Sequence, residues 1–538
     1  MRLPRASGIL LHPTSLPGRF GIGDLGPEAE KFVDHVVETG QKWWQMLPLG
    51  PTGFGNSPYQ SHSSYAGNAL LISPERLVED GWLDEADLAD YPVLPDDHVD
   101  FDAVSAAKHT LFLRAFARIK RDPPAFVEFQ KSAAAWLDDY ALYMALKYAH
   151  DGKPWEAWEP ELIAREPAAL EAARASMAKE IHRTKFIQFL FHEQWERLRG
   201  YCHLRNVGLI GDLPIFVSGD SSDVWARPDL FELDANGKPT VVAGVPPDYF
   251  SEDGQLWGNP LYKWSAHQAE GFAWWIERMK GTIARVDLVR LDHFRGFAAY
   301  WAVPADAPTA ATGRWVKAPG HAFLTALREG LGGLPLLAED LGDITPDVIE
   351  LRDAFNLPGM RILQFAFGDD PMADEYLPYK YIGHCVVYTG THDNDTTVGW
   401  FTAPTTNTTQ SATLVASERA FVLRFVGSDG AHIHWDLIRV EFSSVADTTI
   451  VPMQDILGLD GSARMNIPGH AVGNWKWRFR SDQFDQASRD HLADLTAVYD
   501  RWNGDIPARW RSPRRPKASL DAHDGGTAAS PTDMLMSS

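Results

Sequence analysis

The stretch VDLVRLDH at residues 286–293 decides how this chain is expected to fold. Its first six residues form a short, nearly continuous apolar run, which is typical of a strand buried on both faces, as in a parallel sheet. Seven further runs of this kind occur, and most are separated by stretches of helical length. They lie at residues 8–12, 43–49, 209–217, 334–339, 361–367, 385–391 and 448–453.

Eight alternating strand and helix units predict an α/β fold, namely a closed (β/α)8 TIM barrel. Residues 28–39 form the clearest helix, because Pro27 occupies the first turn, where proline is favoured. The 538 residues exceed what a bare barrel needs, so we expect an insertion between the second and third strands. An open, doubly wound sheet is the alternative that the same alternation allows.

Changes in composition divide the chain into four parts. Residues 1–53 hold the start of the barrel, and residues 54–185 have the Ala-, Leu- and Glu-rich pattern of a mainly helical insertion subdomain. Residues 186–510 complete the barrel and supply its long loops. Residues 511–538 are rich in Pro, Ser, Gly and charge, so we expect them to form a disordered tail.

Composition and charge exclude several classes of partner. With 72 acidic against 50 basic residues, the net charge of −22 repels phosphate backbones and anionic lipid, so neither nucleic acid nor membrane is an expected partner. Only Cys202 and Cys385 are cysteines, too few for a disulfide framework or a cysteine metal cluster, and we expect a cytoplasmic protein. The 20 tryptophans suit either core packing or platforms for the flat faces of sugars.

Acidic side chains follow four of the predicted strands, and active sites of TIM barrels lie at the C-terminal ends of the strands. Each acid alone is explained as a solvated loop residue or a helix cap. Acids after four different strands indicate function when taken together, because like charges packed closely destabilise the fold. The acids are Asp212 on the third strand, Asp292 on the fourth, Glu339 and Asp340 on the fifth, and Asp393 and Asp395 after the seventh.

Two of these acids have surroundings that suit complementary roles. Arg290 and Asp292 are two residues apart on a strand and so point to the same face, where the guanidinium would keep a nucleophilic carboxylate ionised, although a structural ion pair is also possible. Glu339 ends an apolar run, which would raise its pKa and suit a general acid unless it is exposed. Retaining glycosidases place such carboxyl groups about 5–5.5 Å apart.

Two other patterns do not support a cofactor or a metal. The glycines of GIGDLG at residues 21–26 match a dinucleotide motif, but residues 13–20 separate them from the preceding strand, so we disfavour a nucleotide-dependent enzyme. The pair His432 and His434, like His192 followed by Glu193, lacks the spacing of zinc ligands, and we interpret these as loop histidines.

In these residues and in the longer stretches that contain them, the sequence resembles the 4-α-glucanotransferase family, also called amylomaltase or disproportionating enzyme, of the α-amylase clan. The resemblance covers about residues 8–480 and is weakest at 80–180 and 401–445. The stretches that carry it are PLGPTGFGNSPY (48–59), GVPPDYFS (244–251), GQLWGNP (254–260) with Tyr262, RLDHFR (290–295), AEDLG (338–342), THDND (391–395) and RMNIPG (464–469).

The resemblance implies a TIM barrel with helical insertions and without a separate C-terminal β-domain. It also implies that Asp292 is the nucleophile, Glu339 the acid/base and Asp393 a third carboxylate that binds the hydroxyls of the reacting sugar. The further substrate contacts that it implies are Arg290, His293, His392, Asp212, Tyr59, Gln255, Trp257 and Asn466.

The implied reaction is retaining transfer of a 1,4-α-glucan segment from a donor maltodextrin to the 4-hydroxyl of an acceptor glucose or glucan, with no cofactor or metal. Donors would include glucans derived from starch or glycogen. Residues 244–260 and 458–470 are expected to be loops that act as lids and favour the acceptor over water. One alternative is an α-amylase-type hydrolase of the same clan. Another is a catalytically silent maltodextrin-binding protein, but the three intact acids argue against that one.

Overall fold

The computed structural model describes most of the chain. The described residues are 2–247, 253–368, 370–404, 412–470 and 472–511. Apart from Arg511, the predicted tail at 511–538 lies outside them, as does part of the predicted loop at 244–260.

Eight parallel strands form one sheet in the order β10-β11-β12-β1-β2-β3-β6-β9. They are β1 (Ala6–Leu10), β2 (Trp43–Gln45), β3 (Gly208–Leu213), β6 (Leu288–Leu291), β9 (Leu336–Ala338), β10 (Gly359–Ile362), β11 (Cys385–Tyr388) and β12 (Thr448–Pro452). Each lies in one of the eight predicted apolar runs or overlaps it. Because the first strand pairs with the last and the others, apart from β9 and β10, pair in chain order, the TIM barrel is confirmed and the doubly wound alternative is wrong.

The strands are apolar on both faces because successive side chains alternate between two cores. Ile210, Leu288 and Leu337 belong to the core that fills the barrel. Their neighbours Leu209 and Val289 belong to the other core, which packs under the surrounding helices. This alternation explains why the runs look continuous rather than alternately polar and apolar.

The barrel closes between β9 and β10 through a buried carboxylate. The backbone N–H of Ala338 donates to the carbonyl of Pro358 (2.9 Å), and that of Met360 donates to Oδ1 of Asp340 (2.7 Å). Arg352 donates to Oδ2 of Asp340 at 2.5 Å. A side chain at Gly359 would lie 2.5 Å from this carboxylate, so the seam requires glycine there.

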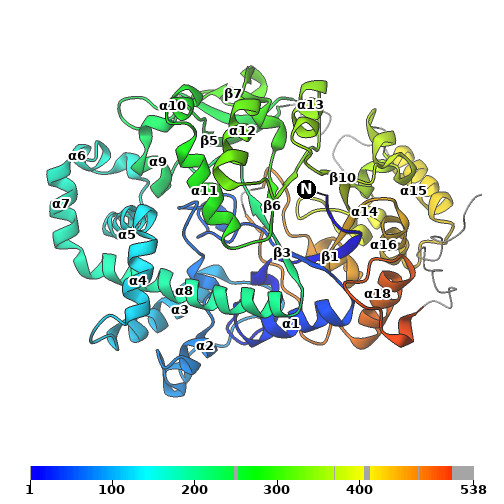
Figure 1. Cartoon of the computed structure of the whole chain (residues 1–538), viewed down its shortest axis with the longest axis horizontal. Coiled ribbons are helices and arrows are strands. Elements are labelled where there is room, and N and C mark those ends of the chain that lie inside the picture. Colours follow the sequence, from blue (N-terminus) through cyan, green and yellow to red (C-terminus); the bar gives the residue numbers. More distant parts are fainter. Residues whose placement is uncertain (1, 248–252, 369, 405–411, 471, 512–538) are drawn as a thin grey trace, which may run out of the picture.

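Helices surround the barrel, and α1 begins at Pro27 as predicted. Figure 1 shows α15, α16 and α18 at the opposite end of the molecule from α5, α6 and α7. Within the described ranges, none of the helices combines the length and apolar composition that a membrane span requires. The barrel helices are α1 (Pro27–Glu38), α9 (Ser222–Ala226), α10 (Trp264–Ala269), α11 (Ala273–Ile283), α12 (Gly320–Leu331), α13 (Pro346–Ala354), α14 (Thr397–Thr402), α15 (Ala412–Val426), α16 (Ile433–Ser443), α17 (Met453–Ile456) and α18 (Gln486–Val498).

Seven helices lie between β2 and β3. They are α2 (Pro74–Glu79), α3 (Phe101–Ala117), α4 (Pro124–Ser132), α5 (Ala134–Ala149), α6 (Pro160–Ile163), α7 (Pro167–Ser176) and α8 (Ala178–Leu204). Residue 185, where the sequence analysis ends the insertion, lies inside α8, which continues to β3. We therefore propose, as a division of the chain only, that residues 54–185 form an insertion subdomain between two parts of the barrel.

A second sheet corrects the prediction of a long loop at 244–260. Its antiparallel strands are β4 (Val241–Val245), β5 (Gln255–Pro260), β7 (Ala299–Pro304) and β8 (Arg314–Lys317), in the order β5-β4-β7-β8. Gly254 and Gly258 have positive φ angles of 69° and 79°, which gives this segment the composition of a loop. The partner strand β7 is distant in sequence, so local patterns do not reveal the pairing.

Two smaller features also differ from or refine the expectations. His192 lies in α8 and His434 in α16, so the prediction that they are loop residues is wrong. The spacing of histidines excludes a zinc motif but carries no information on secondary structure. In the GIGDLG motif, a side chain at Gly23 would lie 2.0 Å from the carbonyl of Pro13, so this glycine permits close packing of the chain.

Asp340→Ala tests the seam between β9 and β10. The change leaves the buried Arg352 guanidinium without its buried partner, so we expect unfolding to become easier by about 3–5 kcal/mol in urea titrations. Asp353→Ala removes the exposed partner of the same arginine and should change stability by only about 0–1 kcal/mol. Equal losses in the two variants would contradict this account of the closure.

Candidate active site

The predicted site residues converge at the C-terminal end of the barrel. The backbone N–H of Asp292 donates to Leu213, and that of Glu339 donates to Leu291, so the ends of β3, β6 and β9 stay in register. A series of contacts, with an electrostatic interaction in place of a contact between Glu339 and Asp292, joins all eleven predicted residues. In order along this series they are Gln255, Trp257, His293, Glu339, Asp292, Arg290, Asp212, Tyr59, His392, Asp393 and Asn466.

A buried guanidinium lies at the centre. Nη1 of Arg290 is 2.8 Å from Oδ1 of Asp292 and 2.9 and 2.8 Å from the two oxygens of Asp212. Burial disfavours the charged form of Arg290, but the two carboxylates outweigh it and raise the pKa of Arg290. Asp292 keeps a quarter of its side chain exposed, whereas that of Asp212 is buried, so Asp292 is the more accessible of the two.

Glu339 has very different surroundings. Its Oε2 accepts the backbone N–H of His293 (2.7 Å), and its Oε1 accepts that of Leu341 (3.0 Å). Burial raises the pKa of Glu339 to about 8, and the negative charge of Asp292 adds to this, while Arg290 and the two backbone donors oppose it. The neighbouring Asp340 belongs to the seam and not to the site, because consecutive residues on a strand face opposite sides.

His293 holds a strained backbone conformation beside Glu339. Its φ and ψ of 48° and 51° are left-handed, which is uncommon for residues other than glycine, although histidine adopts it more often than most. This conformation directs its N–H to Glu339 while its ring packs edge-on against Trp257 at 4.8 Å between centroids. Burial lowers the pKa of His293 to about 4, so the imidazole is neutral near pH 7.

Asp393 lies on the opposite side, in the segment after β11, and 46% of its side chain is exposed. Its Oδ1 accepts a hydrogen bond from Asn466 (2.6 Å) and lies 3.4 Å from Nε2 of His392. The ring of Tyr59 stacks on His392 at 5.2 Å, and the Tyr59 hydroxyl donates to Asp212 (2.8 Å). These contacts link Asp393 to the ionic cluster on β3 and β6.

Three residues near the site were missed by the sequence analysis. Trp475 packs against both Tyr59 and His392, and nothing in its local sequence indicates this. Arg464 lies in the quoted RMNIPG stretch, but that stretch alone does not reveal its contacts. His12 ends the apolar run at residues 8–12, so a search for polar side chains of any kind at strand ends, and not for acids alone, would have found it.

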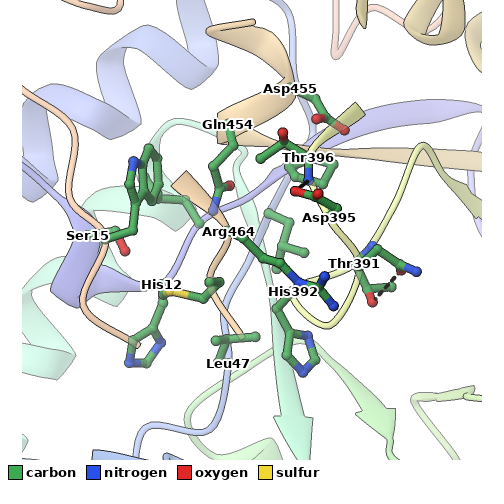
Figure 2. Close-up of a pocket in the computed structure, with 16 residues that line it drawn as sticks. His12, Ser15, Leu47, Thr391, His392, Asp395, Thr396, Gln454, Asp455 and Arg464 are labelled. Carbon is green, nitrogen blue, oxygen red and sulfur yellow. Dashed lines mark hydrogen bonds between the residues drawn. The ribbon is translucent and has the colours of Figure 1, made fainter. Parts of the chain in front are cut away.

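Two pockets adjoin these residues. One, of about 440 Å³, contains His12, Thr391, Asp395 and Arg464, and Figure 2 shows the guanidinium of Arg464 reaching towards Thr391 and His392. The other, of about 650 Å³, is lined by Tyr59 and Asp212 among others. Within the described residues, no group of three or more His, Cys, Asp or Glu side chains is arranged to hold a metal ion.

Comparisons with known proteins decide the family. The model of the family described as 4-alpha-glucanotransferase, glycoside hydrolase family 77, matches residues 11–483. The chain belongs to this family. The 4-alpha-glucanotransferase of Synechocystis sp. is 48% identical over 92% of this chain and 98% of its own length. That of Thermus thermophilus is 48% identical over 93% of this chain and 99% of its own length.

A solved structure agrees with this assignment. The amylomaltase from Streptococcus agalactiae in complex with acarbose matches with a TM-score of 0.88 at 37% identity, covering 93% of this chain and all of the other. The predicted family and fold are thus confirmed, and the chain is an enzyme of the 4-α-glucanotransferase class.

Replacing Glu339 tests the electrostatics of this glucanotransferase. Below about pH 4.5 the carboxyl is protonated in both folded and unfolded chains, whereas between about 4.5 and 8 only the unfolded chain releases the proton. Wild-type stability therefore falls across this window, and Glu339→Gln should become progressively more stable than the wild type from pH 4.5 to 8, measured as the difference in unfolding temperature.

The exposed Glu329 provides the matched control. Glu329→Gln should show a small difference in unfolding temperature that does not grow across the same window. A pH-independent difference for Glu339→Gln would show that Glu339 is not held in its protonated form.

Proposed function

We propose that this enzyme transfers 1,4-α-glucan segments by double displacement, with Asp292 as nucleophile and Glu339 as acid/base. The observation that supports this assignment is the contrast between the two carboxyl groups. Both side chains are partly buried, but Asp292 is ion-paired with Arg290, whereas Glu339 accepts two backbone N–H groups and has a raised pKa. Environments that differ in this way separate the roles of two acids within one site.

In the first step, Glu339 donates its proton to the glycosidic oxygen of the donor while a carboxylate oxygen of Asp292 attacks the anomeric carbon. The glycosidic bond breaks, the reducing-end fragment leaves as an alcohol, and a glycosyl ester forms on Asp292. Arg290 holds the Asp292 carboxylate in place before the attack.

In the second step, the 4-hydroxyl of an acceptor glucose or glucan attacks the anomeric carbon of the ester. Glu339, now a carboxylate, takes the hydroxyl proton, and Asp292 leaves as a carboxylate. Each step inverts the anomeric centre, so two steps retain the α-configuration.

The remaining predicted residues are proposed to bind sugar. Asp393, held by Asn466, would stabilise the positive charge that develops on the reacting ring, and Asp212, His293, His392 and Tyr59 would contact its hydroxyls. The Streptococcus agalactiae amylomaltase binds acarbose. That complex supports maltodextrins, including those derived from starch or glycogen, as the substrates proposed here.

Transfer outcompetes hydrolysis when the acceptor is held better than water. Well-oriented groups reach effective molarities of about 10⁵ M or more. Trp257 and Gln255 on β5 bring an aromatic ring and an amide beside His293 and are proposed to line the acceptor path. Family membership favours transfer over the α-amylase-type hydrolase that the sequence also allowed.

The compartment is also a proposal. Cys202 and Cys385 are both free and buried. Unpaired thiols are typical of reducing compartments, which supports the cytoplasm as the site of action.

Trapping the ester tests both catalytic assignments. Glu339→Gln cannot protonate a glycosidic oxygen, so turnover of maltotriose should fall by about 10²–10⁴-fold. Glucosyl fluoride needs no acid to lose fluoride, so the same variant should accumulate a glucosyl adduct that mass spectrometry of peptides places on Asp292. The control Asp292→Asn/Glu339→Gln should carry none, and an adduct on this control would refute the nucleophile.

The pH dependence gives a second test. Because a protonated Glu339 is needed in the first step, kcat/KM for maltotriose should fall on the alkaline side with a midpoint near pH 8. The initial burst of fluoride from glucosyl fluoride should lack this alkaline limb. Products from maltotriose should be glucose together with oligomers longer than the substrate, whereas glucose and maltose alone would support hydrolysis.

A further inference from the structure

The segment after β11 that carries Asp393 is held by hydrogen bonds to its backbone carbonyls. Three of these carbonyls accept hydrogen bonds from different parts of the barrel mouth. The donors are the backbone N–H of Asn466 to His392 (3.0 Å), the guanidinium of Arg464 to Asp393 (2.5 Å) and the side-chain amide of Gln364 to Asp395 (3.0 Å). The place of Asp393 is therefore set largely through its main chain.

Arg464 makes two of the contacts that matter for Asp393. Its Nη2 donates to the carbonyl of Asp393 (2.5 Å), and its Nε donates to the carbonyl of Asn466 (2.7 Å). The side chain of Asn466 in turn donates to Oδ1 of Asp393 (2.6 Å). One guanidinium thus connects the two backbones whose side chains meet at the face of the site.

We propose that Arg464 is a positioning residue for the transfer reaction, because it fixes the backbones of Asp393 and Asn466 so that the Asp393 carboxylate faces the reacting sugar. In this proposal Arg464 binds the backbone carbonyl of Asp393 and does not contact the substrate. This inference rests on the role proposed above for Asp393.

The chemistry of the position requires arginine. A guanidinium is a rigid, planar fork that donates in two directions at once, whereas a lysine ammonium is a single point on a flexible stem. Arg464 lies in the pocket of about 440 Å³, with Gln454 and Asp395 among its neighbours (Figure 2). The carboxylates of Asp395 and Asp393 act on it through space, and burial still lowers the pKa of Arg464.

The surroundings of Asp395 show how tightly this support is packed. A side chain at Gly461 would lie 2.9 Å from Oδ1 of Asp395, and one at Gly399 would lie 2.4 Å from the same atom. Asp395 also accepts the backbone N–H of Thr396 (2.8 Å). The chain on which Arg464 acts therefore has little freedom to compensate for the loss of the guanidinium.

Kinetics of Arg464→Ala and Arg464→Lys test the proposal. A misplacement of about 1 Å in a catalytic group lowers rates by about 10²-fold, so we expect kcat for maltotriose transfer to fall by about 10–100-fold, with a smaller change in KM. Guanidinium ion at millimolar concentration should partly restore kcat of Arg464→Ala, since the space left by the side chain adjoins the pocket. It should not affect the wild type.

A double-mutant cycle with Asp393→Ala separates positioning from general damage. If Arg464 acts through Asp393, adding Arg464→Ala to Asp393→Ala should lower the residual rate, measured with glucosyl fluoride, by less than about 2-fold. An equal loss with and without Asp393, or a wild-type kcat in Arg464→Lys and Arg464→Ala, would overturn the proposal. If Asp393→Ala is fully active, the role of Asp393 fails as well.

Arg5 provides the matched control. It also donates to backbone carbonyls, those of Ser444, Tyr499 and Phe442, but lies outside the site. Arg5→Ala should lower the unfolding temperature without changing kcat and should show no rescue by guanidinium. If Arg464→Ala does not fold, the kcat and KM of Arg464→Lys decide the question.

Discussion

The guanidinium of Arg290 is the interaction on which the chemistry of this barrel depends. It faces Asp212 and Asp292 directly, and it acts on Glu339 through space. One positive charge cannot balance three carboxylates that are buried or partly buried, so we expect at least one of them to keep a proton. Glu339, whose direct partners are backbone amides and whose pKa is raised to about 8, is the group for which we expect this, so the nucleophile and the acid proposed above would arise from the same charge balance.

The pleat of the strands decides which acids take part in that balance. Glu339 and Asp340 are adjacent in sequence and have the same charge, but a strand sends consecutive side chains to opposite sides. Glu339 therefore meets His293 and Leu341 in the mouth, while Asp340 meets Arg352 and the amide of Met360 in the seam. One dipeptide thus supplies the proposed acid/base and a residue that closes the barrel.

Much of this arrangement is predictable from the sequence because it depends on local rules. Apolar runs located all eight strands, and polar residues at their ends located Asp212, Arg290, Asp292 and Glu339. The errors occur where distant partners decide the structure. The strand pair β4 and β5 looked like a loop because its glycines dominate the pattern, while its pairing with β7 depends on contacts with a remote segment. The contacts of Trp475 with Tyr59 and His392 could not be predicted from the sequence for the same reason.

The ends of the barrel strands and the segments outside these strands have different proposed roles. The ends of β3, β6 and β9 carry the groups proposed to make and break bonds, and these strands lie in register with one another. Tyr59, Trp257 and Asn466 come from segments outside the barrel strands, and the backbone of Asn466 is held by the side chain of Arg464. In the proposed mechanism the acceptor must be placed relative to an ester on Asp292, so the choice between transfer and hydrolysis would depend on these outer segments, whose geometry the sequence encodes least directly.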